Sequence, residues 1–116
     1  MGDNRMKRYF ALLYYVGAEF AQKRGPHREP HLKLVFEANR RGELMYGGAL
    51  GDPPDRALLV FRSDDRSVAE NFAKADPYVT SGLVSRWEVQ PWNIVCGLRE
   101  GDVDPLAGQT ALQQMR

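Results

Sequence analysis

Apolar residues in this chain gather in a few short runs separated by turn residues. Residues 8–16, RYFALLYYV, form an unbroken apolar and aromatic run, which predicts a strand covered on both faces. Residues 43–50 predict a second strand, made irregular by paired glycines, and residues 56–62 a third with an apolar centre. Residues 83–95 predict a fourth strand, in which Pro91 indicates an edge position or a bulge.

Two intervening segments have helical periodicity. Residues 31–42 predict a helix with Pro30 in its first turn and Gly42 at its end. Residues 63–75 predict a second helix, and residues 17–30, which hold glycines, prolines and charges, are expected to form mostly a loop. The predicted apolar faces are Leu34, Val35 and Ala38 in the first helix and Val68, Ala69, Phe72 and Ala75 in the second.

The predicted order β-α-β-β-α-β is the ferredoxin-like arrangement of the α+β class, with an antiparallel sheet and both helices on one face. Its two central strands are the first and third, the two without polar alternation. Because helices cover only one of their faces, we expect a homodimer that packs sheet to sheet as a dimeric α/β barrel, with higher assembly left open. Alternatively, the mostly polar residues 98–116 fold over the sheet of a monomer. We assign residues 1–97 to the domain and 98–116 to a C-terminal extension.

Composition narrows the expected partners and the cellular context. The chain has 116 residues and a net charge of +1, which predicts one domain and no binding of nucleic acid. No signal peptide and no apolar run of about 18 residues is present, so we expect no membrane partner. Cys96 is the one cysteine; it predicts a reducing, cytoplasmic location, and it follows an apolar pair, which favours burial.

His31 and Asp76 are the main candidates for chemistry. Histidine titrates near neutral pH and therefore acts readily as acid or base. Asp76 follows the second predicted helix, where a carboxylate faces the negative end of the dipole at a cost of roughly 0.3–1 kcal/mol. A compensating donor would explain that placement, and both helices pack on one sheet face. We therefore expect the pair to meet, although His31 alone also fits a half-buried helix start and Asp76 an ordinary Asp-Pro turn.

Neither a cofactor nor a metal is expected. The glycine-rich stretch of residues 47–51 lacks nucleotide-binding spacing and a following helix. His27 and His31 are four positions apart, but Pro30 argues against one continuous helical face, which a metal pair would need.

Three segments together resemble the YciI-like (YCII-related) family over residues 7–95: REPHLKLV, the glycine pair of the second strand, and ADPYVTSGLVSRWEVQPW. The Asp-Pro-Tyr-Val-x-x-Gly segment is the most specific part. The resemblance implies a ferredoxin-like fold, a dimeric α/β barrel and an active site around His31 and Asp76. It also implies substrate-binding roles for Arg28, Gly48 and Tyr78.

The chemistry implied by this family is acid-base catalysis without a cofactor. One member is a dehydrochlorinase of a chlorinated hydroxyquinol, and similar barrels include muconolactone isomerases. We therefore expect isomerisation of, or elimination from, a small cyclic or hydroxylated compound. The alternative is a non-catalytic dimeric module that binds a small metabolite or serves another protein.

Overall fold

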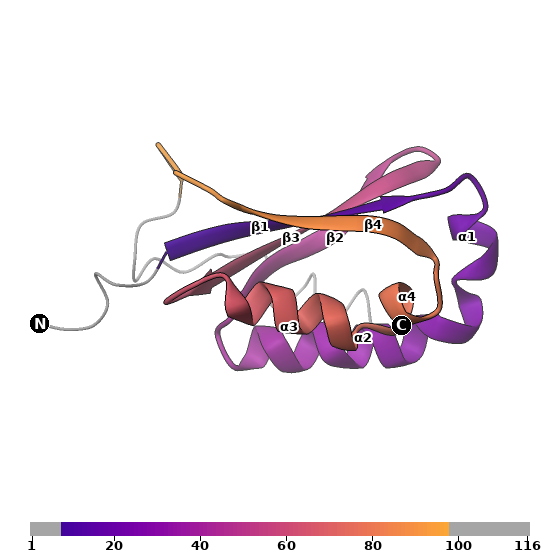
Figure 1. Ribbon diagram of the computed structural model, residues 1–116, viewed down its shortest axis with the longest axis horizontal. Helices are drawn as coiled ribbons and strands as arrows, with labels where there is room; N and C mark the ends of the chain where they lie inside the picture. Colours follow the sequence, from indigo (N-terminus) through magenta and orange to yellow (C-terminus); the bar gives the residue numbers. More distant parts are fainter. Residues whose placement is uncertain (1–7, 98–116) are drawn as a thin grey trace, which may run out of the picture.

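The structure is a computed structural model that describes residues 8–97, and within them one antiparallel sheet carries the fold (Figure 1). Its strand order is β2-β3-β1-β4, so the first and third strands are central, as predicted. Pro91 ends β4 at the sheet edge, where no further strand needs its missing N–H. The strands are β1 Arg8–Val16, β2 Leu44–Gly51, β3 Pro54–Ser63 and β4 Val84–Pro91.

All helices lie on one face of the sheet, which makes a two-layer α+β fold of the ferredoxin-like type (Figure 1). The helices are α1 Phe20–Lys23, α2 Gly25–Arg40, α3 Ser67–Ala75 and α4 Pro77–Thr80. Within residues 8–97, no helix is long and apolar enough to span a bilayer.

The prediction of mostly a loop over residues 17–30 was wrong, because α1 and the start of α2 occupy this segment. Pro26 takes the first turn of α2, where a missing N–H costs nothing, and Pro30 lies inside the helix. A proline so early in a 16-residue helix removes one backbone bond, and packing of the remaining turns on the sheet compensates for it. The segment after α3 is likewise not only a turn, since it forms α4.

The predicted stop of the first long helix at Gly42 is confirmed. Gly42 has φ of 81°, a left-handed conformation that favours glycine. Its N–H donates to the Asn39 carbonyl at 3.0 Å, and the Glu43 N–H donates to the Ala38 carbonyl at 3.0 Å. These two bonds are a Schellman motif, which satisfies carbonyls at the helix end and turns the chain into β2.

The second predicted helix starts later than expected, because residue 63 still belongs to β3. Asp65 accepts a bond from the Ser67 N–H at 2.8 Å and so satisfies a free donor of the first turn. The bonds from Ser67 lower the pKa of the Asp65 carboxyl.

The fourth strand ends at Pro91, short of the predicted residue 95. Residues 92–97 therefore lie beyond the sheet, and Cys96 is exposed, contrary to the expected burial. The apolar pair before it, Ile94 and Val95, indicated a core position, but both side chains are exposed, Val95 almost fully. The predicted extension, residues 98–116, lies outside the described residues.

The core lies between the sheet and the helices, and β1 shows how it is built. Phe10, Leu12 and Tyr14 alternate along the strand and are buried toward the helices. The intervening Ala11 and Leu13 point to the helix-free face and are half-buried. One face of the apolar strand is thus covered within the chain, and the other has only partial cover.

Candidate functional site

Asp76 occupies the junction of two helices, and this explains much of its environment. It is the C-cap of α3 and the N-cap of α4, with an extended backbone of φ −73° and ψ 124°. Its carboxylate accepts a bond from the Tyr78 N–H at 3.0 Å, which caps α4. The carboxylate is 0% exposed, so each of its oxygens needs a donor from the protein.

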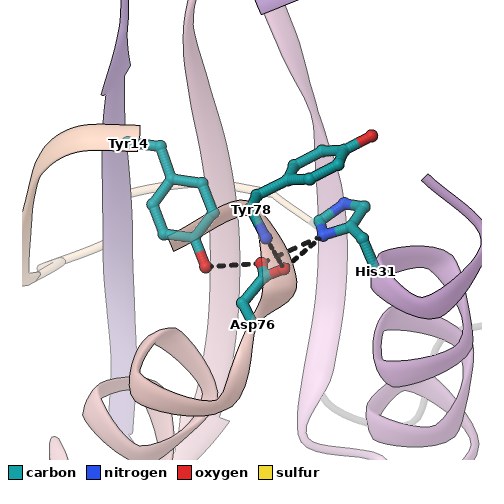
Figure 2. Close-up of polar contacts among 4 residues, drawn as sticks. All are labelled: Tyr14, His31, Asp76 and Tyr78. Atoms are coloured by element: carbon teal, nitrogen blue, oxygen red, sulfur yellow. Dashed lines mark hydrogen bonds and ion pairs between the residues drawn. The ribbon is translucent and has the colours of Figure 1, made fainter. Parts of the chain in front are cut away.

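His31 lies on α2 and supplies one of those donors. Its Nδ1 is 2.9 Å from Oδ1 and 3.0 Å from Oδ2 of Asp76, although the residues are 45 positions apart (Figure 2). The expected meeting of these two side chains is thus present. With the carboxylate ionised, Nδ1 carries the hydrogen and Nε2 keeps a free electron pair, the tautomer a general base needs. No described residue hydrogen-bonds to Nε2, and the His31 side chain is 13% exposed.

Tyr14 completes the carboxylate's environment and was missed by the sequence analysis. Its hydroxyl donates to Asp76 Oδ2 at 2.7 Å from the central strand β1 (Figure 2). Burial, and then the adjacent Asp76, raise the pKa of the Tyr14 phenol far above its ordinary value, so it remains a donor. The residue lies inside an apolar run, where a tyrosine cannot be told from another core aromatic. The one indication in the sequence was its position on the strand, which places it on the buried face, where its hydroxyl needs a partner.

Tyr78 forms one wall beside the imidazole. Its ring stacks on His31 with centroids 3.8 Å apart and planes 9° apart, and Phe20 meets it edge-on at 5.3 Å. The phenol fixes the plane of the His31 ring, while Asp76 fixes its rotation through Nδ1. The imidazole is therefore held in one orientation by its neighbours.

A cavity of about 200 Å³ adjoins this group. Four of the five residues predicted for the site line it, and Asp76 lies behind His31 and out of its lining. Gly48 has no side chain to fill the cavity at this point of β2, and a Cβ added there would meet nothing within 4 Å. The lining residues are Tyr14, Phe20, Arg24, Arg28, His31, Leu32, Val35, Gly47, Gly48, Ala49, Ala57, Leu59 and Tyr78.

The expectation that Pro30 would separate His27 from His31 was wrong, since both belong to α2. A continuous helix therefore carries the two histidines. Among residues 8–97, no group of three or more histidine, cysteine or acidic side chains is arranged to hold a metal ion.

Comparisons with known proteins agree with this fold. A sequence model of the YCII-related domain matches residues 8–93. The solved structure of 5-chloro-2-hydroxyhydroquinone dehydrochlorinase (TftG) from Burkholderia phenoliruptrix AC1100, in complex with 2,5-dihydroxybenzoquinone, is similar with a TM-score of 0.61. That match has 17% identity and covers 73% of this chain and 93% of that chain.

A second similar structure is a candidate antibiotic biosynthesis monooxygenase from Bacteroides thetaiotaomicron VPI-5482. Its TM-score is 0.53 at 12% identity, with 84% of this chain and 98% of that chain covered. A search of curated proteins gave no significant match. At such identities, the two structures support a common fold.

Proposed function

Because this chain belongs to the YCII-related domain family, we propose that it is a cofactor-independent enzyme in which His31 and Asp76 transfer a proton. The reaction is isomerisation of, or elimination from, a small cyclic or hydroxylated compound. Arg28, Gly48 and Tyr78 contribute to substrate binding in the same cavity.

One observation carries this proposal: the imidazole is held at Nδ1 by a fully buried carboxylate and borders a cavity. A carboxylate in that position fixes the tautomer and stabilises the imidazolium that forms when Nε2 accepts a proton. General base catalysis of this kind contributes typically 10²- to 10⁴-fold in rate.

The proton balance is simple in both reactions. In an elimination, Nε2 of His31 takes a proton from the substrate, the electrons of that bond form the new double bond, and chloride leaves with the electrons of the carbon–chlorine bond. In an isomerisation, the imidazolium returns the proton to a different carbon of the same substrate. Neither route needs an oxidant or reductant.

The choice of a hydroxylated ring as substrate rests on analogy with the dehydrochlorinase TftG, whose structure holds 2,5-dihydroxybenzoquinone. In this chain the cavity walls are largely apolar, with Leu32, Val35 and Leu59 among them. A cavity of about 200 Å³ fits one ring with small substituents.

The proposed enzyme is a homodimer whose two sheets pack face to face. Leu13 and Leu58 are register partners on the helix-free face of the two central strands, and both are half-buried in one chain. On β4, Glu88 is the register partner of Leu13, and Arg86 pairs with Glu88. The edge of the apolar centre therefore carries one positive and one negative side chain. A self-complementary face of this type suits a twofold axis.

The test is turnover of lactones, quinols and halogenated quinols, followed by chloride release and by solvent deuterium entering the substrate. We expect His31→Gln and Asp76→Asn to lower turnover at least 100-fold, because one removes the base and the other the carboxylate charge that orients it. Lys33→Ala, an exposed position on the same helix, is the matched control and should leave turnover unchanged.

Two outcomes would count against the enzyme. Full turnover in either folded site variant would remove this pair from the mechanism. Thermal stabilisation by these compounds, with neither chloride release nor deuterium exchange, would favour the non-catalytic binding module instead.

A further inference from the structure

Two arginines at the start of α2 face the same cavity. Arg24, the N-cap, and Arg28 are one helical turn apart, and both line the cavity with His31. The lining contains no aspartate or glutamate. None of the ion pairs among residues 8–97 involves either arginine. The cavity therefore presents positive charge that no carboxylate of the described chain neutralises, which favours an anion.

The Tyr78 hydroxyl is a second sign of a missing partner. The residue is 4% exposed, and among the described residues its hydroxyl is a buried polar group with no hydrogen bond. Figure 2 shows this hydroxyl at the far end of the ring from Asp76, beyond the imidazole of His31. A buried hydroxyl without a partner is costly, so its presence beside a cavity indicates a bond that a ligand completes.

The two arginines and this hydroxyl act on one another. Burial raises the pKa of the Tyr78 phenol. Arg28, through its approach to the hydroxyl and its charge, and then the charge of Arg24 offset part of that rise, and the charge of Asp76 adds to it. The three groups thus share one electrostatic environment in the lining of the cavity.

We propose that Arg24, Arg28 and the Tyr78 hydroxyl form a subsite for the negative charge of a small aromatic anion, a ring that bears a carboxylate or an ionised hydroxyl. This inference rests on the proposed function, because it assigns a substrate class to the same cavity. Arg24 places a bidentate donor on the anion beside Arg28, and Tyr78 gives a single O–H donor. The ring itself lies against the apolar wall of Leu32, Val35 and Leu59.

The subsite also has a chemical consequence for proton transfer. In the keto tautomer of a hydroxylated ring, the sp³ carbon beside the carbonyl carries an acidic proton, and loss of that proton moves the electrons of the C–H bond onto the carbonyl oxygen, beside the two guanidinium groups. The subsite would therefore stabilise the enolate-like charge that forms when His31 removes that proton.

The experiment measures binding of simple probes to the full chain by calorimetry and by thermal shift. Benzoate carries both ring and charge, benzamide keeps the ring without the charge, and acetate keeps the charge without the ring. We expect benzoate to bind at least tenfold more tightly than either of the others, and its affinity to fall as salt rises. Equal affinity for benzoate and benzamide would overturn the proposal, and this comparison needs no variant.

Variants then assign the residues. Arg24→Gln and Arg28→Gln should each weaken benzoate binding about tenfold to a hundredfold, and Tyr78→Phe, which keeps the stacked ring, about tenfold. Arg40→Gln, at the exposed far end of α2, is the matched control. Unchanged benzoate affinity in a folded Arg24→Gln would remove Arg24 from the subsite.

Failure here differs from failure of the proposed enzyme. His31→Gln should keep benzoate binding within about threefold while turnover is lost, because the subsite does not include the imidazole. Benzoate binding without turnover in the wild type would contradict the enzyme and support the subsite. Turnover of neutral substrates without benzoate binding would do the reverse.

Discussion

The environment of Asp76 shows how single residues from distant parts of the chain depend on one another. Donors reach its carboxylate from β1, from α2 and from the backbone of α4. A buried carboxylate remains charged only when such bonds replace water, so each donor stabilises both the fold and the orientation of His31. Tyr14 donates to Asp76, which in turn binds His31, so Tyr14 acts on the imidazole through the carboxylate and is a positioning residue.

Replacing Tyr14 by Phe removes this bond alone. We expect the free energy of unfolding at pH 8 to fall by about 2 kcal/mol, since the buried Asp76 carboxylate loses one of its donors. Burial and Asp76 raise the Tyr14 pKa above its ordinary 10.0, so above about pH 10 the unfolded chain loses this proton before the folded one does. Wild-type stability should then decline by an extra ~1.4 kcal/mol per pH unit, and the gap to the variant should narrow.

Urea unfolding at pH 8 and in the range of about pH 10 to 11 measures both effects. Tyr9→Phe, on the same strand but on its helix-free side, is the control. A gap between wild type and Tyr14→Phe that widens with alkaline pH would show that the phenol does not retain its proton in the folded state.

The elements that carry the site are positioned by local signals at their ends. The Schellman motif at Gly42 ends α2 and turns the chain into β2, and Asp76 separates α3 from α4. α2 carries both His31 and the two arginines, so the direction of that helix decides where they meet the sheet. Its C-terminal motif and its packing on β2 therefore influence the cavity from a distance.

Gly42→Ala tests the first of these ends. Its φ of 81° is unfavourable for alanine by roughly 1–2 kcal/mol, although a Cβ there meets nothing within 4 Å. We expect a loss of about 1 kcal/mol in the free energy of unfolding. Gly17→Ala, which has equal space and no positive φ, should be near neutral in the same urea titration. Equal losses at both positions would mean that backbone conformation is not the cause.

At the scale of the whole molecule, the sheet face without helices is apolar at its centre and only partly buried within the described chain. Ala11, Leu13 and Leu58 lie in its centre and are half-buried in a single chain. A second copy packed on this face would remove that apolar area from water and stabilise the protein through association.

Leu13→Glu places a charge in the middle of this face. We expect a homodimer for the wild type and a monomer for the variant in sedimentation or light scattering, with a lower and less concentration-dependent melting temperature. The reason is the cost of burying an unpaired carboxylate at the twofold interface. Lys33→Gln, exposed on α2, lowers the net charge by the same one unit and controls for charge alone. A monomeric wild type would refute the dimer and favour the alternative in which residues 98–116 cover the sheet.

The order of the major elements and the sheet topology could be predicted from the sequence because they depend on local periodicity. The apolar runs of β1 and β3 marked the central strands, and Gly42 marked a helix end through its own backbone preference. Helix starts were predicted less well. Pro26 and Pro30 look like helix breakers in isolation, whereas Pro26 occupies the first turn of α2 at no cost and packing on the sheet keeps Pro30 inside the helix.

For the site, the sequence by itself determined the candidate pair, since a carboxylate after a helix faces the negative end of the dipole and calls for a donor, and both helices pack on one sheet face. Only the tertiary structure decided their distance, the role of Tyr14 and the convergence of Arg24 with Arg28 and Tyr78. The physical reason is that periodicity acts within a few residues, whereas burial and hydrogen bonding join groups as far apart as 62 positions, as Tyr14 and Asp76 are.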